Sequence, residues 1–341
     1  MTDYQNLNLI ATSSPHIRGE QTTRIIMLDV ILALCPALVW ACYIFGPRAL
    51  SVTAFSVIAC VFFEWLYRWL MKKPQSIDDR SAVVTGMLLA FVCPVQIPYW
   101  MILIGDAFAI LLVKQLFGGI GCNFVNPALA GRAALLASYA GTMTSWAEPF
   151  SRAAVVGSTA DVVTTATPLA MLKAGSVESL MERYSVGDLF LGNVPGSLGE
   201  ISALLLIIGG CYLIWQGVIN WHTPVCFIAT VAVLTFLFPR YGGHVDWMLY
   251  NVFGGGLMLG AFFMATDYAT SPVTKKGQVI FGVGCGLFTV MIRYFGSYNE
   301  GVCYSILVMN LFVALIDKYT RPVRFGTEPR SVLAAKKEAA K

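Results

Sequence analysis

Ten long apolar stretches dominate the 341-residue sequence, and each is close to the length that crosses a lipid bilayer. A helix needs about 20 mainly apolar residues to span the hydrocarbon core. Only 12% of the residues are charged, about half the fraction usual in soluble domains, so a soluble enzyme is excluded. The sequence predicts an all-α integral membrane protein with about ten transmembrane helices. The predicted helices are 25–45, 49–70, 81–95, 98–117, 127–146, 199–217, 223–239, 247–266, 277–294 and 301–317.

A long polar interruption divides these stretches into five and five. Because each half has an odd number of helices, related halves would form an inverted five-plus-five repeat. Gly86-Met-Leu-Leu-Ala and Gly256-Leu-Met-Leu-Gly are faintly similar, although chance similarity of two apolar runs explains them equally well. The third stretch is short, ends before Pro94, and is expected to be a half-helix or a broken helix. The predicted divisions are 1–24, 25–146, 147–198, 199–317 and 318–341.

The basic residues are distributed unevenly between the two sides of the predicted membrane. With the N-terminus inside, 16 of the 23 basic residues fall in cytoplasmic segments and six fall in outer segments. Cytoplasmic loops of membrane proteins carry the excess of Lys and Arg. Residues 1–24 lack the apolar core of a cleavable signal peptide. We therefore expect both termini, 1–24 and 318–341, in the cytoplasm and the 147–198 loop outside it.

The nine cysteines form no Cys-x-x-Cys pair, and most fall within apolar runs. In such runs cysteine behaves as a small hydrophobic residue. We therefore expect neither a disulfide framework nor a metal or iron–sulfur site built by this chain alone. A cysteine contributed to a cluster shared with another subunit remains open.

Asp29, Glu64 and Asp106 fall within predicted helices and Asp267 at the end of the eighth, where a charge is costly and normally faces protein or water. Glu64 is one turn from Arg68, which predicts a structural ion pair. Asp29 is expected near the inner interface. Asp106 lies in mid-helix and Asp267 beside a Thr-, Ser- and Pro-containing break. These two are candidates for an ion path, with a purely structural role as the alternative.

The predicted outer loop contains a hydroxyl-rich segment, 157–173, with the sequence GSTADVVTTATPLAMLK. Its simplest interpretation is a short helix with Pro168 in its first turn and Thr164 or Thr165 as its cap.

The run from Asp161 through Thr164, Thr165 and Ala166 to Thr167 resembles a flavinylation motif, an acid followed by Ser/Thr-Gly-Ala-Thr. That motif belongs to the family of the Rnf D subunit and the B subunit of the sodium-translocating NADH:quinone reductase. The resemblance implies FMN bound covalently to Thr167 through a phosphoester, with Asp161 and Thr164 as further motif residues. Thr165 departs from the usual glycine. The flavin transferase of this family works outside the cytoplasm, in agreement with the charge count.

Further matches in the same order extend from residue 13 to about 326, and the short N-terminal segment favours the Rnf D branch. They are Ser13-Ser14-Pro15-His16-Ile17-Arg18, Asp79-Arg-Ser81-Ala-Val-Val-Thr85-Gly, Lys114-Gln-Leu-Phe-Gly118-Gly119-Ile-Gly121-Cys-Asn123-Phe-Val-Asn126-Pro127, Thr266-Asp267-Tyr-Ala-Thr270-Ser271-Pro272, Tyr298-Asn-Glu300-Gly301 and Asp317-Lys-Tyr319-Thr320-Arg321-Pro322.

The Gly118-Gly119-Ile-Gly121 stretch permits positive φ and close backbone approach at a helix end. A plain turn between helices is the alternative, and no βαβ unit supports a dinucleotide fingerprint. The resemblance implies that Gly118, Gly119, Asn123 and Asn126 belong to an internal flavin or ion region. Arg132 would either neutralise a flavin anion or phosphate, or extend to the inner interface.

The resemblance implies a flavin-carrying subunit, not catalytic alone, of an ion-translocating ferredoxin:NAD⁺ oxidoreductase in the cell inner membrane. Implied cofactors are covalent FMN and a second, non-covalent flavin such as riboflavin. Implied partners are the other Rnf subunits, the flavin transferase, Na⁺ or H⁺ and the lipid bilayer, and no nucleic acid. No side chain is expected to be catalytic by itself. Alternatives are the B subunit of the quinone reductase, a stand-alone secondary transporter, and a cofactor-free membrane anchor.

Overall fold

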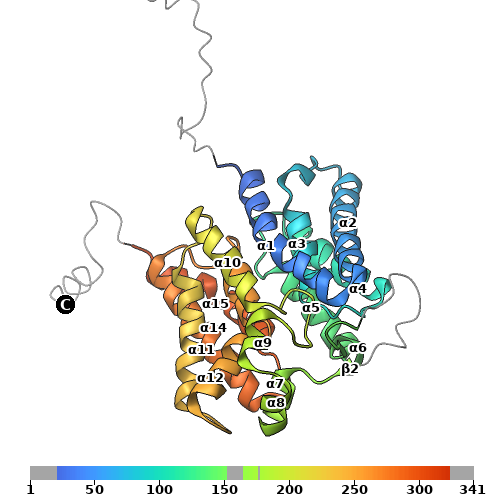
Figure 1. Ribbon diagram of the computed structural model, residues 1–341. Coiled ribbons are helices and arrows are strands. Elements are labelled where there is room, and N and C mark those ends of the chain that lie inside the picture. Colours follow the sequence, from blue (N-terminus) through green and yellow to red (C-terminus); the bar gives the residue numbers. More distant parts are fainter. Residues whose placement is uncertain (1–20, 152–163, 176, 323–341) are drawn as a thin grey trace, which may run out of the picture.

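The computed structural model describes residues 21–151, 164–175 and 177–322, and these are mostly helical (Figure 1). The elements up to residue 151 are α1 (Thr23–Phe45), α2 (Pro47–Leu70), η2 (Ile77–Asp79), α3 (Ser81–Phe91), α4 (Tyr99–Ala107), the π-helix η3 (Phe108–Gln115), α5 (Pro127–Ser138), α6 (Ala140–Met143) and β1 (Trp146–Ala147). The later elements are β2 (Thr164–Thr165), α7 (Pro168–Lys173), α8 (Val177–Arg183), α9 (Val186–Leu191), α10 (Ala203–Trp215), α11 (His222–Leu237), α12 (His244–Phe253), α13 (Leu257–Leu259), the π-helix η4 (Gly260–Met264), α14 (Lys275–Phe295) and α15 (Val302–Thr320).

All ten predicted stretches are helical over most of their length. Within the described residues, four helices are long and apolar enough to cross a membrane, namely α1, α2, α14 and α15. Helix α12 and the α13–η4 segment form a bent pair that would make a fifth span. The helical membrane class is therefore confirmed, whereas the count of ten spans remains a prediction.

Glycines allow two pairs of helices, α2 with α3 and α11 with α14, to pack closely. A Cβ on Gly86 of α3 would lie 2.8 Å from the Ser56 carbonyl oxygen of α2. On α14, a Cβ on Gly282 would lie 2.7 Å from the Thr223 carbonyl oxygen of α11. Small residues at such contacts let the backbones of membrane helices approach one another. The glycines therefore hold α2 against α3 and α11 against α14.

The third stretch behaves as its Pro94 predicts, because α3 ends at Phe91 and an irregular segment follows. Arg48 donates to two carbonyl oxygens of that segment, from Nε to Val95 at 3.0 Å and from Nη2 to Ile97 at 3.2 Å. These bonds satisfy backbone groups that would otherwise be unpaired inside a bilayer.

The eighth stretch contains a break that was not predicted from the sequence. Helix α12 ends at Phe253, and α13 begins after Gly254, Gly255 and Gly256 at a bend of 60°. Gly255 has φ of 67°, a conformation that glycine adopts without a Cβ penalty. The prediction of one continuous helix over 247–266 was therefore wrong.

The interior of the described fold is apolar, and so is much of its surface. Phe45 and Phe227 are fully buried in one cluster that joins helices of both halves. Trp215 and Phe295, in contrast, are 82% and 80% exposed. Large apolar side chains on the outside require lipid or a partner protein to cover them.

Candidate functional site

Thr167 is the first residue of the site, and it caps the short helix α7. Its Oγ1 accepts a hydrogen bond from the backbone N–H of Ala170 at 3.2 Å, and Pro168 occupies the first helical position. The expectation that Thr164 or Thr165 caps this helix was therefore wrong. Only 6% of Thr167 is exposed, so its hydroxyl belongs to a structured, enclosed segment.

A two-residue antiparallel ladder fixes the chain just before Thr167. Strand β1 pairs with β2 so that Trp146 lies opposite Thr165 and Ala147 opposite Thr164. This pairing is the exception to the all-α prediction within the described residues. The side chain of Thr164 and the whole of Asp161 lie outside the described residues. Figure 1 shows α7 and α8 at the lower end of the helices, opposite the first turn of α1.

Thr167 and Arg132 line the same cavity, which we call the threonine cavity. It has a volume of about 330 Å³, within the lower range of ligand-binding pockets. The lining residues are Arg132, Leu136, Met143, Thr144, Trp146, Thr165, Ala166, Thr167, Ala170, Tyr298, Asn299, Glu300, Cys303 and Tyr304. The cavity thus brings α5, the flavin-motif segment and the start of α15 together, although they are far apart in the sequence.

Arg132 is buried in the protein, so the alternative that it extends to the inner interface was wrong. Its Nη1 lies 3.3 Å from Oε1 of Glu200, and its Nη2 forms an ion pair with Oε2 of Glu300. Arg132 is 6% exposed. A buried guanidinium shared by two carboxylates is a strong electrostatic element, because low dielectric surroundings screen it little.

Asn123 and Asn126 line a second cavity, which we call the asparagine cavity. It has a volume of about 100 Å³ and mainly apolar walls from α1, α3, α10 and η4. Asn126 caps α5 by accepting hydrogen bonds from the N–H groups of Ala128 and Leu129. Its Nδ2 also donates to the Met264 carbonyl oxygen at 3.3 Å. Asn126 therefore joins the two halves at the wall of this cavity.

Gly118 and Gly119 adopt the positive φ that the sequence predicted, at 123° and 99°. They belong to the loop that leads to Asn123, but they are not among the residues that line the asparagine cavity. A Cβ on Gly119 would lie 2.8 Å from Nη2 of Arg68. The described contacts therefore give these glycines a role in shaping the turn.

The two ion-path candidates occupy different surroundings. Asp267 lines the asparagine cavity, and its Oδ2 accepts a hydrogen bond from Thr270 at 3.1 Å. Asp106 is fully buried and lines neither cavity. Its Oδ1 accepts from the Ser56 hydroxyl at 2.6 Å and the Cys60 thiol at 3.2 Å. The structure therefore separates the two acids instead of joining them in one site.

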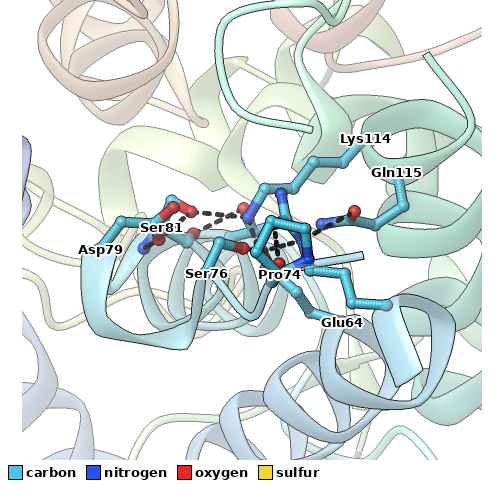
Figure 2. A network of polar contacts seen from close by, with 9 residues as sticks. Glu64, Pro74, Ser76, Asp79, Ser81, Lys114 and Gln115 are labelled. Carbon is cyan, nitrogen blue, oxygen red and sulfur yellow. Dashed lines mark hydrogen bonds and ion pairs between the residues drawn. The ribbon is translucent and has the colours of Figure 1, made fainter. Parts of the chain in front are cut away.

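Lys114 is a buried cation of this region to which the sequence analysis gave no place in a site. It lies 3% exposed on the π-helix η3, and its Nζ is 2.7 Å from Oε2 of Glu64. Its Nζ also donates to the Ser81 hydroxyl at 2.6 Å, a contact drawn in Figure 2. Arg68, the predicted partner, reaches Glu64 only at 4.0 Å. The main partner of Glu64 is therefore Lys114.

This polar network continues from the asparagine cavity toward the 71–80 loop (Figure 2). Ser76 donates to Glu64 Oε1 and Ser81 donates to Asp79 Oδ1, both at 2.5 Å. Lys114 and Ser81 line the cavity. Lys114 could have been singled out from the sequence, because Lys114 and Asp106 are the two charged residues of the mainly apolar run 98–117.

Known proteins resemble this chain over nearly its whole length. A family model described as the NQR2, RnfD, RnfE family matches residues 10–326. The D subunit of the Na⁺-translocating ferredoxin:NAD⁺ oxidoreductase complex of Acetobacterium woodii is 50% identical over 336 residues, covering 98% of each chain. The D subunit of the proton-translocating ferredoxin:NAD⁺ oxidoreductase complex of Clostridium ljungdahlii is 45% identical over 322 residues, covering 93% of this chain and 96% of that one. This chain therefore belongs to the NQR2, RnfD, RnfE family.

Proposed function

We propose that this protein is the D subunit of an ion-translocating ferredoxin:NAD⁺ oxidoreductase complex, and that Thr167 carries FMN. The observation that carries the proposal is the meeting of Thr167 and Arg132 at one cavity. Relatives that match the chain from end to end are subunits of such complexes. The other subunits of that complex and a flavin transferase are the proposed partners.

The residues around the threonine cavity fit a flavin attached through its phosphate. The Thr167 hydroxyl supplies the attachment oxygen, and its cap to Ala170 holds that oxygen at the cavity wall. Arg132 supplies a positive charge for an anionic group. Tyr298 and Tyr304 stack with ring centroids 5.0 Å apart and form an aromatic wall. The bound flavin would supply one-electron redox chemistry, which amino-acid side chains do not provide.

We further propose that the asparagine cavity holds the second, non-covalent flavin. Apolar walls with a few convergent polar groups are typical of cofactor pockets, and the volume of about 100 Å³ requires the surrounding helices to separate before a whole flavin enters. Asn123 and Asn126 offer amide groups, and Lys114 offers an ammonium group at the same cavity. These residues come from the loop before α5 and from η3, so the cofactor would lie between helices.

The packing supports the proposed inverted repeat of five and five helices. The first helices of the halves, α1 and α10, pack on each other, as do the last, α5 and α15. Within each half the second helix packs on the fourth, as α2 on α4 and α11 on α14. This correspondence is the pattern expected of two related halves around a pseudo-two-fold axis.

We propose the cell inner membrane as the location, with both termini cytoplasmic and Thr167 on the opposite side. The bias of basic residues supports this orientation. Asp267 remains the better ion-path candidate of the two acids, because it lines a cavity. The relatives named above are a Na⁺-translocating and a proton-translocating complex, so the proposed ion is Na⁺ or H⁺.

In-gel flavin fluorescence tests the attachment. The chain is expressed with the flavin transferase and separated under denaturing conditions, which remove any flavin that is not covalently bound. The wild-type band should fluoresce, and Thr167→Ala should abolish the signal. Thr165→Ala is the matched control, because it removes a neighbouring hydroxyl and leaves the attachment oxygen. A dark wild-type band, or a fluorescent Thr167→Ala band, would contradict the proposal.

A further inference from the structure

Glu200 is a buried acid whose hydrogen bonding is incomplete. It lies on the loop between α9 and α10, at the start of the predicted stretch 199–217, and is 7% exposed. Its Oε1 contacts Arg132, whereas its Oε2 has no hydrogen-bond partner among the described residues. The Ser197 hydroxyl lies close to the Glu200 carboxyl group, and its Oγ has no other hydrogen-bond partner among the described residues. A buried carboxylate oxygen without a partner is costly when the group is charged.

The fold leaves room for this carboxyl group at a glycine. A Cβ on Gly256 would lie 2.1 Å from Oε1 of Glu200. Any larger residue at the break between α12 and α13 would therefore push the carboxyl group away from Arg132. Gly256 therefore leaves the space that the Glu200 carboxyl group occupies beside Arg132.

The charges around Glu200 leave it short of positive partners. The charged groups that face it are Glu300, Arg132 and Arg293. Arg132 is shared with Glu300, and Arg293 donates to the carbonyl oxygens of Asn251 and Gly254.

Glu200 also reaches the attachment residue through a small cavity. This cavity of about 20 Å³ is lined by Thr167, Glu200 and Glu300, among others, and it has room for about one water molecule. Thr167 and Glu300 line both this cavity and the threonine cavity. Water can therefore connect the Glu200 carboxyl group to the wall that holds the proposed flavin.

We propose that Glu200 is the residue that couples proton uptake to charge at the threonine cavity. When one electron enters the threonine cavity from a reduced centre of a partner protein, Glu200 binds one proton from water in the small cavity that it shares with Thr167. The carboxylate becomes a neutral carboxyl group, so Arg132 loses one negative partner and neutralises the new charge. When the electron leaves, Glu200 releases the proton. This inference rests on the proposed flavin attachment at Thr167.

Redox titration of the covalent flavin in the purified complex tests the inference across about pH 5 to 9. One proton per electron changes the reduction equilibrium tenfold per pH unit, about 59 mV for a one-electron couple. Glu200→Gln should remove this contribution, and Glu200→Asp should retain a pH-dependent potential. Glu148→Gln, at an exposed acid paired with Arg183, should match the wild type. Identical pH dependence in wild type and Glu200→Gln would overturn the inference while leaving the flavin assignment intact.

A second measurement tests the inference in the case that the Glu200→Gln chain fails to assemble or to carry flavin. Infrared difference spectra between acidic and alkaline pH are recorded on Thr167→Ala, which lacks the attachment oxygen. When Glu200→Asp is added to the Thr167→Ala chain, the band of the protonated carboxyl group should shift. When Glu200→Gln is added instead, the band should disappear. A band unchanged by both substitutions would overturn the inference. Absence of flavin from the wild-type chain would overturn both the inference and the proposed function.

Discussion

Replacing Lys114 with methionine tests how strongly the buried ion pair holds η3 to α2. The side chains of Lys114 and Glu64 are 3% and 1% exposed and lie 2.7 Å apart. Methionine fills a similar volume but leaves the Glu64 carboxylate without its main partner. Removing one member of a buried pair costs about 3–5 kcal/mol. Because Ser76 still donates to Glu64 at 2.5 Å, we expect a loss of about 3 kcal/mol in the free energy of unfolding.

The assay is equilibrium unfolding in mixed detergent micelles, analysed as a double-mutant cycle. Glu64→Gln combined with Lys114→Met removes both charges, so we expect a loss of only about 1 kcal/mol relative to wild type. Lys276→Met is the matched control, because Lys276 is exposed on α14 and should change stability by less than about 0.5 kcal/mol. Additive effects of Glu64→Gln and Lys114→Met would refute the reasoning.

Three further predictions rest on single contacts. Gly256→Ala should lower thermal stability by about 1–3 kcal/mol, because its Cβ would lie 2.1 Å from Glu200; an unchanged melting temperature would contradict this. Thr167→Ala should cost about 1 kcal/mol through the lost cap of α7, and Thr167→Ser should restore stability, as measured by unfolding without flavin. Arg183→Ala should cost less than about 1 kcal/mol, because its pair with Glu148 is solvent-exposed; a larger loss would show a role beyond this pair.

The helical stretches could be predicted because their cause is local. Runs of apolar residues require backbone hydrogen bonds within the segment, and helices provide them. Pro94 ended α3 as expected, since proline disfavours helical geometry in the residue before it. The positive φ of Gly118 and Gly119 was also predictable from the residue type alone.

The partners of buried charges could not be predicted, because they are set by tertiary packing. Glu64 has Arg68 one turn away in sequence, yet a π-helix brings Lys114 closer. Arg132 offered two interpretations, and only the folded chain shows Glu200 and Glu300 as its partners. Neither acid was assigned a site from sequence, because their approach to Arg132 depends on tertiary packing.

The break in the eighth helix shows a similar limit. Three consecutive glycines, Gly254–Gly256, permit either a close helix contact or a bend. The choice depends on Arg293, which donates to the carbonyl oxygens of Asn251 and Gly254 released by the bend. That bond joins residues about forty positions apart, beyond the reach of periodicity arguments.

Mass spectrometry of the tryptic peptide that spans residues 153–173 tests the central assignment most directly. Purified from cells that contain the flavin transferase, the wild-type peptide should carry the mass of FMN less one water, and fragmentation should locate it on Thr167. An unmodified peptide from such a preparation, or FMN located on another residue of this peptide, would contradict the account.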